Sequence, residues 1–98
     1  MGLKIENKEC IVMRIPEITR GVSAKNDREW VKAEVIVEFS DTGVSHNLCM
    51  IAWNKTARLI EDMCLKKGSV VNSDAIIKSE KYDKWWRTDI TIDRIKFQ

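Results

Sequence analysis

The feature that most constrains the fold is a strict two-residue alternation that runs from Trp30 to Phe39. One set of alternating positions is apolar and comprises Val31, Ala33, Val35, Val37 and Phe39. The other set is mostly polar and comprises Trp30, Lys32, Glu34, Ile36 and Glu38. A period of two with one apolar face is typical of a β-strand that is buried on one side only. We therefore expect this segment to be a strand between a core and the solvent.

Similar patterns and turn signals predict four further strands. We expect a first strand over residues 3–15, which Pro16 ends because proline cannot donate to a strand ladder, and then a polar loop over residues 17–28. Residues 40–43 predict a turn, and a third strand follows over residues 44–53. The last two strands are expected over residues 69–79 and 85–97, with a polar hairpin tip at residues 80–84. A change of parity at Ile95 and Phe97 predicts a bulge in the last strand.

The pattern changes from strand to helix after residue 53. Ala57, Ile60 and Cys64 recur at helical spacing, and Asn54 precedes them as an N-cap residue. The segment 66–68 (Lys-Lys-Gly) combines positive charge with a glycine, as helix C-termini prefer. We therefore expect a short helix over residues 55–65.

Five strands with one short helix between strands 3 and 4 is the order of the OB fold, an all-β, five-stranded Greek-key barrel. The 98 residues leave room for a single domain, which we place over residues 1–98. A small open α+β sheet is the alternative, but it would leave strand edges that closure removes. OB barrels bind oligonucleotides or oligosaccharides across strands 2 and 3.

Charge and cysteine content exclude several classes of function. The 17 lysines and arginines against 15 aspartates and glutamates give a net charge of +2, so anion binding must depend on local placement. Cys10, Cys49 and Cys64 are widely spaced and His46 is the only histidine, which fits neither a structural zinc site nor a disulfide framework. We expect free thiols in a cytoplasmic protein that has no metal, no cofactor and no enzymatic activity. The apolar runs are too short to cross a bilayer, so no membrane partner is expected.

Three stretches of the second half resemble the core of bacterial single-stranded DNA-binding proteins. They are residues 51–57 (Ile-Ala-Trp-Asn-Lys-Thr-Ala), residues 65–71 (Leu-Lys-Lys-Gly-Ser-Val-Val) and residues 81–90 (Lys-Tyr-Asp-Lys-Trp-Trp-Arg-Thr-Asp-Ile). The last stretch also resembles a small bacterial OB-domain family of unknown function. The resemblance covers roughly residues 50–98, with weaker support from Trp30 to Phe39, and it implies an OB domain that binds single-stranded DNA, with RNA as an alternative. Asn54 replaces the family's usual glycine, which its N-cap role explains.

The end of the chain departs from the resemblance. Full members of that family carry a flexible tail with an acidic tip that recruits repair and replication proteins. The sequence stops at Gln98, directly after the last expected strand. We therefore expect no such acidic tail here and do not carry its partners over.

Binding of single strands without sequence preference needs exposed aromatic rings for the bases and cations for the phosphates. Trp30 and Trp85 lie on the polar side of their strands, Trp53 matches the resembling family's stacking aromatic, and Tyr82 lies at the hairpin tip. We expect bases to stack on these four residues, although each tryptophan has a structural alternative in the core. The expected phosphate contacts come from basic residues around the second strand and the last hairpin: Lys25, Arg28, Lys32, Lys81, Lys84 and Arg87. Nearby carboxylates weaken this field, so we expect moderate, salt-dependent binding.

Two alternatives remain open at this stage. One is an OB-type protein-interaction or assembly module without nucleic-acid affinity, and the other is an RNA or oligosaccharide binder that uses the same groove. Ile36 and Ile51 are apolar residues on an otherwise polar face, which is typical of a subunit contact. We therefore expect a homo-oligomer, either a dimer or a tetramer.

Overall fold

The alternating segment forms a strand that is buried on one side, as predicted. In the computed structural model, which describes residues 2–98 apart from the side chains of Asp41 and Tyr82, it belongs to β3 (Glu29–Asp41). Val31, Ala33, Val35 and Val37 are all buried. The core that they face also receives Val12, Met50, Ala52, Val71, Ala75, Ile92 and Ile95.

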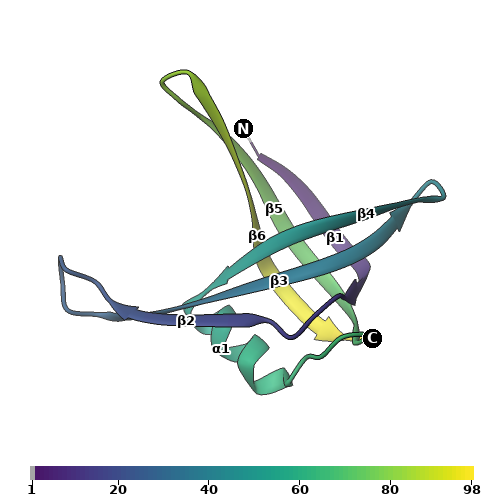
Figure 1. Cartoon of the computed structure of the whole chain (residues 1–98), viewed down its shortest axis with the longest axis horizontal. Coiled ribbons are helices and arrows are strands. Elements are labelled where there is room, and N and C mark those ends of the chain that lie inside the picture. The colour runs from purple at the N-terminus through teal and green to yellow at the C-terminus, as the bar shows by residue number, and fades with distance from the viewer. Residues whose placement is uncertain (1) are drawn as a thin grey trace.

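The other elements follow in a mostly β arrangement with one helix. They are β1 (Gly2–Val12), β2 (Glu17–Val22), β4 (Val44–Trp53), α1 (Asn54–Met63), β5 (Val70–Tyr82) and β6 (Trp85–Phe97). The strand order is β1-β5-β6-β4-β3-β2, and β1 also pairs with β3. This last pairing closes β1, β5, β6, β4 and β3 into a ring, while β2 lies outside the ring along β3 (Figure 1).

The position of the helix relative to the strands differs from the sequence prediction. We expected it between strands 3 and 4, and it lies between β4 and β5, because residues 17–22 form an additional strand instead of a loop. This strand, β2, pairs with β3 from Glu17 opposite Glu34 to Val22 opposite Glu29. Its polar composition hid it, since an outlying strand needs only the hydrogen bonds of one neighbour and little apolar surface.

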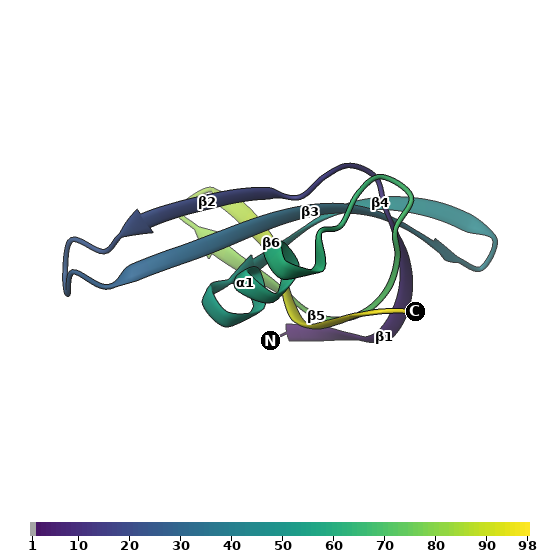
Figure 2. The ribbon, with the colours of Figure 1, turned by 90° about the horizontal axis from the view of Figure 1, so that it is seen from below.

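The helix itself is shorter than expected, and its caps differ. It covers Asn54–Met63, and Cys64 ends it in the left-handed conformation with φ of 52°, four residues before Gly68. Asn54 is not the N-cap, since that position is occupied by Trp53 and no side chain caps the helix. Ala57 and Ile60 are the buried residues of α1, and the helix contacts β3, β4 and β6 at one end of the ring (Figure 2).

Two strand irregularities meet on β5. The bulge predicted in the last strand is confirmed: Asp74 pairs with Arg94 and Ala75 with Ile92, so Asp93 is an extra residue of β6. A second bulge, in β1 between Ile5 and Lys8, has no counterpart in the prediction. Its Asn7 has a φ of 46°, and the backbone N–H of Asn7 donates to the Asp74 carboxylate. Asp74 thus lies between two bulged strands.

The strands extend beyond the ring as two-stranded ribbons. The turns β3–β4 at Thr42-Gly43 and β5–β6 at Asp83-Lys84 are the tips of two of them, and the β2–β3 loop is the tip of a third. Figure 1 shows the β2–β3 and β5–β6 tips pointing in different directions. Among the described residues, no helix is both long and apolar enough to span a bilayer.

Candidate nucleic-acid interface

The outward side of β2, β3 and β4 carries two tryptophans side by side. Residues that pair directly across antiparallel strands point to the same side of the sheet. Gly21 pairs with Trp30 between β2 and β3, and Lys32 pairs with Trp53 between β3 and β4. Because the neighbouring Val31 is buried, this face points away from the core. We call the surface formed by Gly21, Trp30, Lys32 and Trp53 the tryptophan face.

The two indoles of the tryptophan face contact each other. The ring centroids of Trp30 and Trp53 are 6.1 Å apart, and the rings are inclined by 64°, in an edge-to-face arrangement. Trp53 is 47% exposed, whereas Trp30 is half-buried. The Lys32 ammonium lies 5.6 Å from the Trp53 ring centroid and 3.1 Å from a carboxylate oxygen of Glu34. An indole ring that could stack with a base and an ammonium group that could contact a phosphate thus lie side by side on the exposed sheet face.

A glycine makes the position of Trp30 possible. The Trp30 indole lies across the backbone of Gly21, so that a Cβ at this position would come within 2.3 Å of Cζ2 and 2.6 Å of Cε2. Carbon atoms in contact are normally about 3.5–4.0 Å apart. Any side chain at residue 21 would therefore displace the indole from the seat in which it meets Trp53.

Asn54 fixes the start of α1 next to Trp53. Its φ of 50° lies in the left-handed region, where asparagine is the most tolerated residue after glycine. Its side-chain oxygen Oδ1 accepts a hydrogen bond of 3.3 Å from the backbone N–H of Val31 in β3. The replacement of the resembling family's glycine is thus explained by this backbone conformation and not by N-capping.

The β5–β6 ribbon carries the other two tryptophans on opposite sides. Trp85 and Trp86 are 77% and 69% exposed, and the Lys81 ammonium lies 6.0 Å from the centroid of the Trp86 ring. By the alternation of its strand, Trp86 lies on the same side as the buried Ile92. The ribbon leaves the ring before it reaches Trp86, so that no core covers this residue. Strand parity alone could not have revealed where the ring ends.

The remaining predicted site residues lie at the ends of the ribbons. Lys25 and Arg28 are exposed in the β2–β3 loop, whose backbone is held by a 2.8 Å hydrogen bond from the N–H of Ser23 to the carbonyl of Arg28. Lys84 is exposed in the β5–β6 turn, and the nearby Arg87 donates a 3.2 Å hydrogen bond to Asp89. The side chain of Tyr82 lies outside the described part of the structure. Because the two tips point in different directions (Figure 1), these cations form two separate groups.

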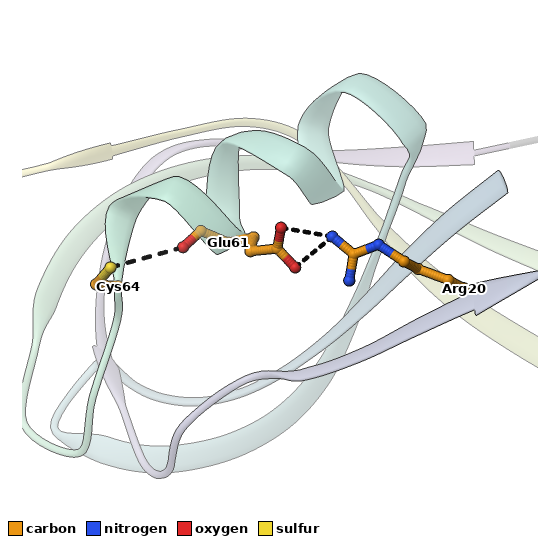
Figure 3. A network of polar contacts seen from close by, with 3 residues as sticks. All are labelled: Arg20, Glu61 and Cys64. Atoms are coloured by element: carbon orange, nitrogen blue, oxygen red, sulfur yellow. Dashed lines mark hydrogen bonds and ion pairs between the residues drawn. The ribbon is translucent and has the colours of Figure 1, made fainter. Parts of the chain in front are cut away.

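An ion pair ties β2 to the helix on the side opposite the tryptophan face. Arg20 Nη2 lies 2.5 Å from Oε1 and from Oε2 of Glu61, as Figure 3 shows. This hydrogen bond and the carboxylate charge raise the pKa of the Arg20 guanidinium. The same Glu61 accepts, through its backbone carbonyl, a 3.8 Å hydrogen bond from the Cys64 thiol. The ion pair thus links the strand that carries Gly21 to the helix.

The histidine and the cysteines do not belong to the tryptophan face in the part of the chain that the structure describes. There, no three His, Cys, Asp or Glu side chains are grouped as metal ligands. His46 packs against Phe39, with ring centroids 5.4 Å apart. Burial raises the pKa of the Cys10 thiol, which keeps it protonated and poorly nucleophilic.

The ring of five strands with the single helix at its end is a fold that this chain shares with solved single-stranded DNA-binding domains. No family model matches the sequence, and no curated protein matches it significantly. The likeness to known proteins is therefore one of structure.

Three solved structures illustrate the likeness. The SSB domain of a Synechococcus sp. protein has a TM-score of 0.66 and 18% identity, and the match covers 96% of this chain and 91% of that one. The mitochondrial single-stranded DNA-binding protein Rim1 of S. cerevisiae has a TM-score of 0.58 and 14% identity, with coverages of 99% and 94%. The small single-stranded DNA-binding protein of Streptomyces coelicolor has a TM-score of 0.50 and 16% identity, with coverages of 100% and 94%. At these identities the likeness establishes a shared fold.

Proposed function

We propose that this protein binds single-stranded DNA on an OB-type barrel, by base stacking and phosphate contacts and without a catalytic step. The observation that carries the proposal is the Trp30–Trp53 pair with Lys32 beside it on an open sheet face. Stacking on an aromatic ring contributes about 1–3 kcal/mol per base and tolerates any base. The names of the structural neighbours, all single-stranded DNA-binding proteins or domains, support the same ligand.

The second ribbon extends this interface. Trp85 and Trp86 expose two further rings, and Lys81 and Lys84 supply charges close to them. We propose that bases stack on Trp85 as well as on the tryptophan face, and that Trp86 takes part in the same way. We keep Tyr82 as a candidate stacking residue on the grounds of its sequence position alone.

Electrostatics set the expected strength of binding. Two of the proposed phosphate ligands already have acidic neighbours, because Lys32 pairs with Glu34 and Arg87 pairs with Asp89. The proposed ligands Lys25, Arg28, Lys81 and Lys84 form no ion pair with a described carboxylate. We therefore propose moderate affinity with a marked dependence on salt, since each phosphate contact releases counterions.

A fluorescence titration tests the proposal. Oligothymidylate should quench the tryptophan fluorescence at low salt, because a stacked base contacts the indole directly, and the quenching should weaken as salt is added. Oligouridylate, added in parallel, reports whether RNA competes. Lys67→Ala provides a control, because Lys67 is exposed and lies outside the proposed interface. A flat titration of folded protein at low salt would refute nucleic-acid binding.

A second role, in self-assembly, is favoured by the apolar residues of the outer sheet face. Ile36 and Ile51 are only partly buried on the same face as Glu34 and Cys49, with which they pair. We propose that this face contributes to a dimer or tetramer, since a small domain gains stability by association. A light-scattering mass equal to the monomer at micromolar concentration would contradict it. If the oligomer forms and the DNA titration is flat, the assembly module is the correct interpretation.

A further inference from the structure

A groove separates the first turn of α1 from the bulged part of β5 and β6. Its volume is about 680 Å³, within the range of roughly 300–1,000 Å³ that small-molecule sites occupy. Lys55, Thr56 and Leu59 of α1 form one wall, and the other wall is formed by β-strand residues that include Asn72, Arg94, Ile95 and Lys96. None of these residues belongs to the tryptophan face.

Unpaired cations dominate the electrostatics of the groove. Lys55, Arg94 and Lys96 line it, and none of them forms an ion pair with a described carboxylate. Asp74 stands directly opposite Arg94 in the sheet, yet its carboxylate accepts the Asn7 backbone N–H at the neighbouring bulge. The Asp74 carboxylate is thus engaged at the bulge and forms no ion pair with Arg94. Asp93 is the other carboxylate of the lining, which leaves three cations against two acids.

The helix adds to this attraction for anions. The first turn of α1, which contributes Lys55 and Thr56 to the groove, contains no acidic residue, and no side chain caps it. The first N–H groups of a helix have no partner within it, and they carry the positive end of the helix dipole. An anion in this groove would meet both the dipole and the three side-chain cations.

A buried acceptor in the same groove remains unsatisfied. The side-chain oxygen Oδ1 of Asn72 is buried and has no hydrogen-bond partner within the described part of the chain. Burying an acceptor without a hydrogen-bond donor lowers the stability of the fold, because the acceptor has lost its hydrogen bonds to water. Leu59, which is exposed, adds apolar surface next to the polar groups. A fitting ligand therefore combines an anion, a hydrogen-bond donor and an apolar body.

We propose that this groove is a second binding site, which takes a nucleotide unit. Its phosphate would be bound by Arg94, Lys96 and Lys55, an N–H of its base would donate to Asn72, and its sugar and base would lie on Leu59. Continuity favours a nucleotide over an acidic peptide, because Trp53 and Lys55 are two residues apart along the chain, at most about 7 Å between Cα atoms. The nucleotide has two sources, a strand that continues from Trp53 or a free mononucleotide, and only the first rests on the proposed function.

NMR titrations distinguish the two sources of the nucleotide. They also distinguish binding in the groove from binding at the tryptophan face. Amide signals of Thr56, Asn72 and Ile95 report on the groove, while fluorescence reports on the indoles. The titrants are thymidine monophosphate, oligothymidylates of about 6 and about 24 nucleotides, chosen around the roughly 4–16 nucleotides that one OB fold covers, and polyglutamate. We expect the groove signals to shift with the mononucleotide or with the longer strand.

Matched charge reversals make the test specific. Arg94→Glu should weaken the groove response by at least about tenfold, because hydrogen bonds to charged groups stabilise by that amount or more. Lys67→Glu, which makes the same charge change at an exposed position outside the groove, should leave it intact. Thermal melts show that both variants fold. The mononucleotide response should also survive Trp53→Ala.

Three outcomes would overturn the proposal. The first is the absence of groove shifts with every nucleotide while fluorescence quenching persists, which leaves the tryptophan face standing. The second is a response that Arg94→Glu and Lys67→Glu retain equally. The third is a response to polyglutamate alone, which would make the groove a peptide site. Groove shifts with the mononucleotide but without quenching by strands would instead support the groove and refute the proposed function.

Discussion

The substitution Gly21→Ala isolates the geometry of the tryptophan face from the chemistry of its residues. It adds one methyl group, which would lie 2.3 Å from Cζ2 of Trp30 and 3.0 Å from its Nε1. The backbone of Gly21 is not in the left-handed region, so alanine is compatible with the strand itself. The indole must therefore move, and its edge-to-face contact with Trp53 is lost.

The magnitudes predict a change in binding with little change in stability. Loss of the aromatic contact lowers the free energy of unfolding by about 0.5–1.5 kcal/mol. The lower conformational entropy of the unfolded chain with alanine raises it by about 0.4–1 kcal/mol. The melting temperature should therefore shift by no more than about 8 °C in either direction. If one base loses its platform, affinity for oligothymidylate falls by about 1–3 kcal/mol, a factor of roughly 5–150.

A double-mutant cycle provides the control. The assay is the fluorescence titration, with near-ultraviolet circular dichroism to follow the contact between the two indoles. In a Trp30→Ala background, Gly21→Ala should have no further effect on affinity, because the group it displaces is absent. The reasoning is refuted if Gly21→Ala binds as tightly as the unmodified protein, or if it weakens binding equally in both backgrounds.

Three further predictions concern other parts of the molecule. Trp53→Ala should weaken binding of every sequence while the melting temperature changes little, because the side chain is 47% exposed; a large loss of stability would show that it is a core residue instead. Lys84→Ala should lower the slope of log affinity against log salt by about one if Lys84 contacts a phosphate, and an unchanged slope would exclude that contact. In a thiol-labelling time course, the exposed Cys49 and Cys64 should react first, whereas Cys10 should react only on unfolding, because its burial raises its pKa; simultaneous labelling of all three would contradict this.

The local periodicity of the sequence was sufficient to predict most strands. The alternation in residues 30–39 identified the buried side of β3, and the change of parity at Ile95 and Phe97 predicted a bulge in the last strand, which the structure places at Asp93. The position of Trp30 on the outer side followed from the same reasoning, whereas Trp53 was singled out by the family resemblance. These features depend on which side of a strand each residue occupies, and a two-residue period in the sequence indicates this directly.

Features set by tertiary pairing escaped prediction. β2 is polar, and only its ladder with β3 makes it a strand. Asn54 looked like an N-cap because its residue type suits that role, yet the turn between β4 and α1 requires its left-handed backbone. The contact between Gly21 and Trp30 joins two strands across a loop, and a single sequence carries no signal for such close approaches. The groove beside α1 likewise depends on two bulges that only the folded sheet brings together.

The length of the β5–β6 ribbon has a consequence for how the two halves of the interface behave. Between Lys78 and Thr88, every residue whose side chain is described is exposed, so this ribbon has solvent on both sides and no core of its own. An isolated hairpin of this kind is only marginally stable, and local opening costs far less there than in a buried strand. The Trp30–Trp53 pair, by contrast, rests on β3, whose inner face is packed. One pair of indoles is therefore preorganised, whereas the other can adapt its shape to whatever it binds.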